Sequence, residues 1–329
     1  MFATFMTGAI SVMIVFLFGC VGEIITEKSG HLNMGTPGIM CIGAAGAATG
    51  AKIFIDISGG PVSVASGEGN AFLGIFLIVL FALIFSALAG LLYSFMVDTL
   101  RCNQNITGLV LTTLGAGLYP FIGGIVCPSA DRGAFTFIGR TYFNGLFPSE
   151  FSSANGFNKI LFSYGFLTYL IIIIAVVALL IISKTRIGLN LRAVGENPGT
   201  SDASGINVNR YKYLATLIGS CISGLGGLYY LFEFNRGSME YNVESFGWIA
   251  VALVIFSIWN TGIAIGGSFI FALLYQLPIV INTNGPLNEI VKLLPYVFTV
   301  LVLIGISILN KKETQPPSSL GLSFFREDR

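Results

Sequence analysis

The chain has 329 residues, of which 54% are hydrophobic and only 10% charged, so it is not an ordinary water-soluble protein, in which about a quarter of the residues carry charge. The net charge of +1 gives no electrostatic reason to expect a nucleic-acid partner. One histidine and five scattered cysteines without a CxxC pair indicate neither a metal site nor a disulfide framework.

Apolar segments long enough to enter a bilayer follow one another along the whole chain. The hydrocarbon core of a membrane is about 30 Å thick and needs about 20 apolar residues per helix. The predicted spans are 5–21, 35–57, 72–97, 106–127, 164–183, 213–232, 246–259, 263–281 and 291–309. The sequence therefore predicts an all-α fold, a polytopic transmembrane helical bundle of about nine spans, within a range of eight to ten.

Two of these segments admit a second interpretation. Residues 1–20 end in LFGC, which resembles a lipoprotein cleavage box, but the apolar run is long and lacks the positively charged start of a signal peptide. We therefore expect a first transmembrane helix there. The segment 246–259 is short for a full crossing, so it is either a short helix or a broken one.

The polar stretches between the spans set the expected orientation. Basic residues are dense in 184–212 and in the tail 311–329, and this bias places both stretches on the cytoplasmic side. The longer stretch 128–163 and the N-terminus then lie outside the cytoplasm. We expect one transmembrane domain over 1–310, followed by a flexible cytoplasmic tail over 311–329.

Glycine is abundant, with 41 residues concentrated in the predicted spans. Small residues let helices approach closely in a membrane, and this explanation suits most of the glycines. At MGTPGIM (34–40) and WNTGIAIGG (259–267), glycine and proline could instead mark helices that are interrupted along a transport path. The sequence is compatible with both interpretations.

Catalytic signatures such as HExxH, GxSxG or a P-loop do not occur in the sequence, so we expect transport and no enzymatic activity. The acidic residues fall near the ends of predicted spans, where water can solvate them, and no intramembrane relay for protons or sodium is expected. Neutral polar side chains near the spans either line a path for a polar solute or join helices. The candidate path residues are Asn33, Gly35, Asn105, Thr112 and Asn260.

The stretch 184–212 has the features of a structured loop. GENPG (195–199) must turn, Pro198 suits the first turn of a helix, and Gly205 suits the position after its end. The sequence predicts a short cytoplasmic helix between the fifth and sixth spans. An ordinary positively charged loop would not need so defined a turn, so we favour a docking surface for a cytoplasmic partner.

Three motifs resemble ABC importer permeases of the branched-chain amino acid and simple-sugar class. GLNLRAVGENP (188–198) followed by GINV (205–208) is similar to the cytoplasmic coupling segment of that class. EKSGHLNMGTPGIM (27–40) resembles its signature around the second span. NQ at 103–104 with TGL at 107–109 resembles the nucleoside branch, which takes up purine nucleosides and simple sugars. The likeness covers most of residues 20–280 in order and spacing.

The resemblance implies a multi-pass permease subunit of the bacterial cytoplasmic (inner) membrane that takes up nucleosides or related simple sugars. Its partners would be cytoplasmic ABC ATPase subunits, a second permease subunit in a homo- or heterodimer, an extracytoplasmic solute-binding protein and membrane lipid. The ATPase subunits would bind ATP and magnesium, and this chain would bind no cofactor. The residues that the resemblance assigns to ATPase coupling are Gly188, Arg192, Ala193, Gly195, Glu196, Asn197, Pro198, Asp202 and Gly205.

The sequence departs from the pattern of this class in three places. Thr112 stands where many nucleoside-type members have an amide, and TSDAS (200–204) replaces a more alanine-rich coupling helix. The stretch 128–163 has no close match. The alternative function is an ATPase-independent secondary transporter or channel for small polar solutes, for which the sequence lacks an intramembrane ionisable pair.

Overall fold

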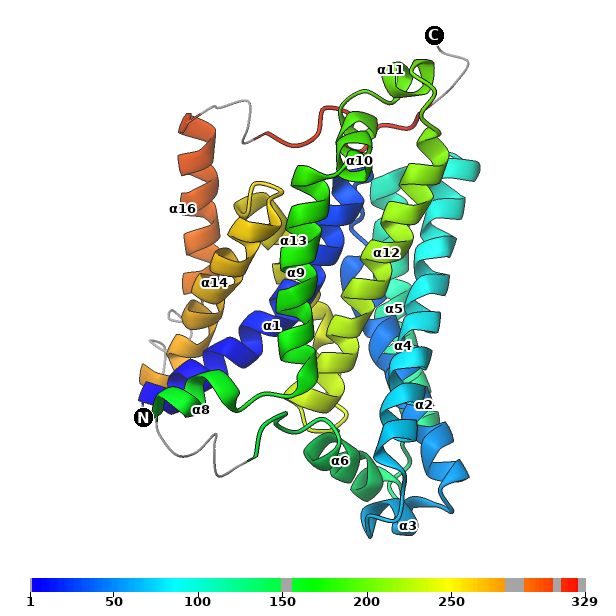
Figure 1. Ribbon diagram of the computed structural model, residues 1–329, viewed down its shortest axis with the longest axis vertical. Coiled ribbons are helices and arrows are strands. Elements are labelled where there is room, and N and C mark those ends of the chain that lie inside the picture. Colours follow the sequence, from blue (N-terminus) through cyan, green and yellow to red (C-terminus); the bar gives the residue numbers. More distant parts are fainter. Residues whose placement is uncertain (1, 149–155, 282–292, 310–314, 325–329) are drawn as a thin grey trace.

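The computed structural model describes residues 2–148, 156–281, 293–309 and 315–324. Every regular element in these ranges is a helix, and the long helices run side by side between two ends of the molecule (Figure 1). Seven of the described helices are long and apolar enough to cross a membrane. The all-α, membrane-spanning bundle that the sequence predicts is therefore confirmed.

Three helices form the buried centre of the bundle: α1 (Phe2–Glu27), α2 (Thr36–Ile57) and α12 (Val208–Tyr229). Most of their side chains are covered by other parts of the chain. A Cβ atom on Gly43 of α2 would lie 2.3 Å from the carbonyl oxygen of Gly224 in α12, and one on Gly227 would lie 1.9 Å from that of Met40. These glycines are therefore explained by close helix packing.

The outer helices leave most of their side chains exposed or half-buried, and these side chains are largely apolar. They are α4 (Ala71–Ser94), α5 (Gln104–Val126) and α9 (Phe166–Lys184). Such faces suit contact with lipid or with another membrane subunit. Two helices continue for a π-helical turn: η1 (Phe95–Thr99) follows α4, and η2 (Tyr230–Phe234) follows α12.

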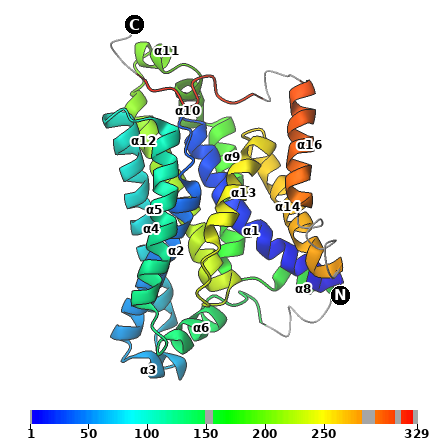
Figure 2. The ribbon, with the colours of Figure 1, turned by 180° about the vertical axis from the view of Figure 1, so that it is seen from behind.

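The two ends of the bundle carry different short helices. One end, drawn at the bottom of Figure 1, has α3 (Pro61–Ala65), α6 (Arg132–Thr141) and α8 (Gly156–Phe162). The opposite end has α10 (Arg186–Glu196) and α11 (Pro198–Ala203). We name them the α6 end and the α11 end. The view from behind in Figure 2 shows that the chain starts at the α6 end and that its last described residues lie at the α11 end.

The last part of the bundle contains the short helix that the sequence left ambiguous. It consists of α13 (Val243–Phe256), α14 (Thr261–Ile281) and α16 (Leu294–Leu309). α13 has 14 residues and α16 has 16, so each is short for a helix that crosses the whole membrane. The number of nine spans therefore stays a prediction. Ile258 and Trp259, with φ of 54° and 51°, turn the chain sharply between α13 and α14.

Part of the tail of the chain is bound to the helical bundle. The sequence predicts a flexible segment over 311–329, and residues 310–314 and 325–329 lie outside the described ranges. Residues 315–324 instead lie against the α11 end, where Ser319 is buried and its amide donates to the carbonyl oxygen of Gly195 at 3.1 Å. These hydrogen bonds hold residues 315–324 in place, although the sequence predicts a flexible segment there.

Candidate functional site at the α11 end

α10 begins at a capped turn and packs back on α9. The Thr185 hydroxyl oxygen accepts a hydrogen bond from the Gly188 amide at 3.2 Å, which caps the first turn. A Cβ atom on Gly188 would lie 2.2 Å from the Ile181 carbonyl oxygen, so a larger residue would push the two helices apart. Leu191 and Val194 are buried on the same side. The opposite side of α10 is free to form a surface.

α11 is a short helix with a defined start and end. Asn197 Oδ1 accepts a hydrogen bond from the Thr200 amide at 3.0 Å, and Pro198 occupies the first turn. Gly205 follows the helix with φ of 85°, a conformation that glycine adopts without strain. A Cβ atom at Gly205 would meet nothing within 4 Å. Glycine is therefore favoured at this position by its backbone conformation and not by a lack of space.

The residues assigned to ATPase coupling divide between surface and interior. The exposed or half-exposed ones are Arg192, Ala193, Glu196, Asn197, Pro198, Asp202 and Gly205. Gly188 and Gly195 are buried, and a Cβ atom on Gly195 would lie 2.4 Å from the carbonyl oxygen of Lys28. Burial lowers the pKa of the Lys28 ammonium, and the nearby Glu196 carboxylate partly offsets this. α10 and α11 thus present a polar, charged face, which is held against α9 at Gly188 and against the α1–α2 loop at Gly195.

Three of the five candidate path residues meet where α2 begins. Asn33 Oδ1 accepts a hydrogen bond from the Gly35 amide at 2.9 Å. Thr112 of α5 donates its hydroxyl to the Met34 carbonyl oxygen at 2.8 Å. A Cβ atom on Gly35 would lie 2.9 Å from a methyl group of Leu111, so α5 approaches this loop closely. Asn33, Gly35 and Thr112 therefore join the α1–α2 loop to α5.

The other two candidate path residues, Asn105 and Asn260, are exposed and lie outside this group. Asn260 Oδ1 accepts from the Gly262 and Ile263 amides at 2.9 and 3.4 Å, so it caps α14. The amide that faces inward beside Asn105 is that of Gln104, whose Oε1 accepts from the Leu32 amide at 2.7 Å. The amide side chain that faces inward in this part of α5 is therefore Gln104, one residue before the candidate Asn105.

A buried pair of carboxyl groups lies in the last turns of α1. Glu23 is 1% exposed and Glu27 is 3% exposed. Glu23 accepts hydrogen bonds from the Thr36 hydroxyl and, at 3.2 Å, from the Asn33 amide, whereas Glu27 accepts from the indole N–H of Trp259. The expectation that water solvates these acids is wrong, because α1 extends to Glu27 and the following loop folds back over its last turns.

His31 connects the α1–α2 loop to α12 and η1. Its Nδ1 lies 2.8 Å from the Thr216 hydroxyl oxygen, and its Nε2 lies 2.8 Å from Asp98 Oδ1. Burial lowers the pKa of the His31 imidazole, although its hydrogen bond to Asp98 acts in the opposite direction. A neutral ring satisfies both contacts when Nε2–H donates to Asp98 and Nδ1 accepts the Thr216 hydroxyl.

This polar cluster was missed by sequence reasoning, although one signal was available. Glu23 and Glu27 are four residues apart, so they share one face of a helix and neighbour each other. No sequence signal links His31 to Asp98 or to Lys212, which is only 1% exposed in α12. These residues come together because α12 and η1 pack beside the α1–α2 loop.

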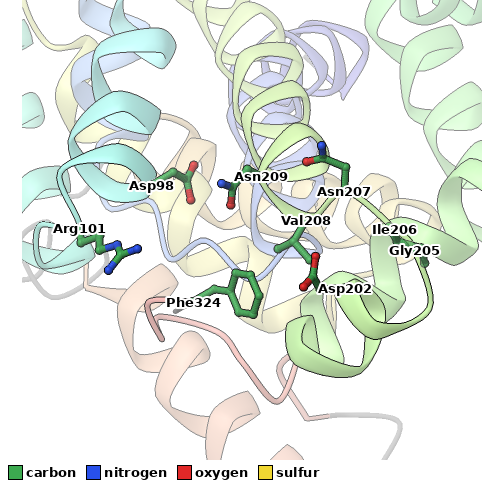
Figure 3. A pocket seen from close by; sticks show the side chains of 9 residues that line it. All are labelled: Asp98, Arg101, Asp202, Gly205, Ile206, Asn207, Val208, Asn209 and Phe324. Carbon is green, nitrogen blue, oxygen red and sulfur yellow. The ribbon is translucent and has the colours of Figure 1, made fainter. Parts of the chain in front are cut away.

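A pocket of about 320 Å³ opens at the α11 end, between η1 and the start of α12 (Figure 3). Asp98 and Arg101 line one side, and the turn 205–209 with Asp202 lines the other. Figure 3 shows the ring of Phe324 between these two sides. No group of three metal-ligating residues occurs in the described ranges, so the pocket gives no support for a metal site there.

The sequence of this chain matches a known protein family. The family model described as branched-chain amino acid transport system, permease component, matches residues 5–304. This range begins within α1 and contains the other six helices that are long enough to cross a membrane, together with α10 and α11.

Several curated proteins are similar to this chain over most of their length. The nucleoside ABC transporter permease protein NupC of Lactococcus lactis is 30% identical, with 87% of each chain covered. The guanosine ABC transporter permease protein NupQ of Bacillus subtilis is 28% identical over 87% of this chain and 86% of its own. The putative glucose ABC transporter permease protein TsgC13 of Haloferax volcanii is 28% identical over 95% and 94%.

A solved structure has a related fold. The structure titled "An inward-facing conformation of a putative metal-chelate type ABC transporter" matches with a TM-score of 0.51 and covers 91% of this chain and 85% of its own. The sequence identity is 12%, so the likeness concerns the arrangement of the helices alone.

Proposed function

This chain belongs to the family of branched-chain amino acid transport system permease components, and from this membership we propose that it carries nucleosides or related simple sugars into the cell. The chain is an ABC transporter permease, a transport component. The observation that carries the choice of solute is the likeness, over most of the chain, to permeases named for nucleosides and for guanosine. A glucose permease among the relatives supports sugars as the second solute class.

Uptake by the assembled transporter tests this proposal. The chain would be reconstituted in proteoliposomes with its ATPase subunits and its solute-binding protein, after thermal-shift screening of that binding protein against nucleosides, pentoses and hexoses. We expect ATP-dependent accumulation of a nucleoside, and no accumulation when ATP is replaced by a non-hydrolysable analogue. Accumulation of none of these solutes, with ATPase activity intact, would contradict the choice of solute class.

We propose that α11 and the exposed face of α10 form the docking surface for the ATPase. The support is the polar surface of Arg192, Glu196 and Asp202 on a helix pair that is fixed to the bundle by Gly188 and Gly195. Charged, exposed residues on a rigid element suit a protein partner. Replacing Arg192 with Glu should reduce the amount of ATPase that copurifies with the chain, and unchanged copurification would argue against this surface.

The same placement supports an orientation with the α11 end in the cytoplasm. Lys28, Arg101, Arg186 and Arg192 all lie at that end, and basic residues favour the cytoplasmic side. The chain would then sit in the bacterial inner membrane with its C-terminus in the cytoplasm and the α6 end facing the solute-binding protein. A second permease subunit would complete the path.

We place part of the solute path near the start of α2, where Asn33, Gly35 and Thr112 meet. The support is their burial and their shared contacts between the α1–α2 loop and α5. In this structure Asn33 and Thr112 bond to the protein itself, so these contacts would have to open before the two side chains could bind a solute. ATP and magnesium belong to the ATPase subunits in this proposal.

The burial of two acidic residues bears on the alternative function, a transporter driven by an ion gradient. The sequence suggests no buried acid that could relay ions, which speaks against such a transporter, yet Glu23 and Glu27 are buried. The burial of these acids removes one reason against a gradient-driven transporter, and the family membership supports an ATP-driven permease. Uptake that follows a proton or sodium gradient after ATP depletion would reverse this choice.

A further inference from the structure

The last described segment, residues 315–324, is folded onto the α11 end, and we name it the C-terminal strap. Pro317 and Ser319 are buried in it, and Leu320 packs against the hydrophobic core of the bundle. The Leu320 amide donates to the Pro317 carbonyl oxygen at 3.0 Å, and the Leu322 amide donates to that of Ser319 at 3.1 Å. The strap therefore has turns of its own and an apolar anchor.

The strap binds the end of α10 through two consecutive serines. The Ser318 hydroxyl donates to Glu196 Oε2 at 2.6 Å, and its amide donates to the same oxygen at 3.3 Å. The Ser319 hydroxyl and amide both donate to the Gly195 carbonyl oxygen, at 2.5 and 3.1 Å. This carbonyl belongs to the last turn of α10, where helix carbonyl groups lack partners within the helix. The strap thus supplies those partners directly before α11 begins.

The strap also binds the α1–α2 loop and the start of α5. The Gly321 amide donates to the Gly30 carbonyl oxygen at 3.1 Å. Gln104 Nε2 donates to the Leu322 carbonyl oxygen at 3.3 Å, while Gln104 Oε1 accepts from the Leu32 amide at 2.7 Å. Gln104 therefore ties α5, the α1–α2 loop and the strap together at one point.

The far end of the strap reaches the pocket in Figure 3. There Phe324 lies between Arg101, which follows η1, and Asp202 of α11. A segment of about ten residues thus contacts the end of α10, the α1–α2 loop, α5 and the surroundings of α11 in succession. The α1–α2 loop, α5 and the α10–α11 segment are separated from one another by long stretches of sequence.

We propose that the C-terminal strap is a mechanical link that transmits movement of α10 and α11 to the α1–α2 loop and α5. A displacement of Glu196 and Gly195 would pull on the strap and, through Gly321 and Leu322, on the loop that holds Asn33. Movement is transmitted between sites by contiguous hydrogen-bonded and packed elements that shift together. This inference rests on the proposed function, because it takes α11 as the element that the ATPase moves.

Uptake per ATP hydrolysed is the quantity that tests the link. The variant is the double substitution Ser318→Ala and Ser319→Ala in the complete transporter, which removes the side-chain bonds to Glu196 and Gly195. The matched control is Ser323→Ala, a serine of the same strap that forms no hydrogen bond with the part of the chain that the structure describes. We expect the double variant to lower the uptake-to-ATP ratio by about fivefold or more, the lower range of site-to-site couplings, with ATPase activity and melting temperature retained.

An unchanged uptake-to-ATP ratio in a well-folded double variant would overturn the proposal. The failure of the proposed function has a different signature, since the unaltered transporter would then accumulate none of the solutes. A strap with a purely structural role would lower the melting temperature and the two activities together, leaving their ratio unchanged, which also overturns the proposal.

Hydrogen exchange of the unaltered transporter provides a test that needs no variant. The amides of Ser319 and Gly321 donate to Gly195 and Gly30 in the docked strap, so we expect slow exchange both without nucleotide and in the ATP-bound state. Exchange at the rate of an unfolded peptide in both states would show that the strap is not docked, and the proposal would be wrong.

Discussion

Single polar residues deep in the bundle determine how its helix ends are held. His31, Glu23 and Glu27 are all buried, and each has a hydrogen-bond partner on a different element. Burying a polar group costs free energy unless its hydrogen bonds are made, so these contacts fix the α1–α2 loop in one position. The consequence is that a change to one partner should be felt as a loss of stability.

The buried imidazole of His31 should make stability depend on pH. Because burial lowers its pKa, the folded protein binds fewer protons than the unfolded chain near and below the ordinary histidine pKa of about 6.5. Stability contributed by the neutral ring is therefore present above that value and lost as the pH falls, by up to about 1.4 kcal/mol per pH unit. The measurement is the thermal unfolding of the detergent-solubilised protein between pH 7.5 and 5.5.

The control for this prediction is His31→Gln, which keeps hydrogen-bonding groups but cannot titrate. Since His31 is the single histidine of the chain, the difference between the two proteins isolates its contribution. We expect a smaller loss of melting temperature on acidification in the variant. Parallel pH curves for the two proteins would show that folding does not lower the pKa of His31.

At the scale of elements, the turn between α13 and α14 depends on a contact with α1. Trp259 lies in this turn, and its indole N–H donates to the buried carboxyl group of Glu27. Trp259→Phe would leave that carboxyl group without its donor, and an unsatisfied buried partner costs about 1–3 kcal/mol. We expect a lower melting temperature in this variant. Calorimetry or dye binding measures it without relying on tryptophan fluorescence, which the substitution changes.

The chain offers a matched control, because its second tryptophan also donates to a glutamate. Trp248 donates to Glu244 Oε1 at 3.3 Å, but on the exposed surface of α13. Trp248→Phe should change stability by no more than about 0.5 kcal/mol, as is usual for surface positions. If both substitutions cost the same, burial of the Glu27 contact would not be the reason for the effect.

For the whole molecule, the orientation in the membrane determines whether an ATPase can reach the α11 end. Single cysteines would be introduced into a cysteine-free variant, at Ser204 beside α11 and at Ser129 before α6, both of which are exposed. We expect an impermeant maleimide added to intact cells to label position 129 but not 204, and to label both after the membrane is opened. The reverse pattern would place the α11 end outside and exclude ATPase docking there.

The sequence by itself determined the class of the molecule and the position of α11. Long apolar runs have no stable alternative to membrane helices, because backbone polar groups must be satisfied within the segment in lipid. The turn at Asn197–Pro198 and the glycine at 205 are local features, and the structure has a helix between them. Local chemistry of this kind is readable because it depends on neighbours in the sequence.

Only the tertiary structure decided which polar residues are buried and what they touch. Gln104 faces inward and Asn105 outward, although the two are adjacent and chemically alike. Glu23 and Glu27 are enclosed because α2 and the turn at Trp259 cover the end of α1. The strap over 315–324 docks on α10, although Ser318 and Glu196 are 122 positions apart in the sequence and no local pattern predicts their contact. Such contacts depend on packing between distant segments, and packing is set by the fold as a whole.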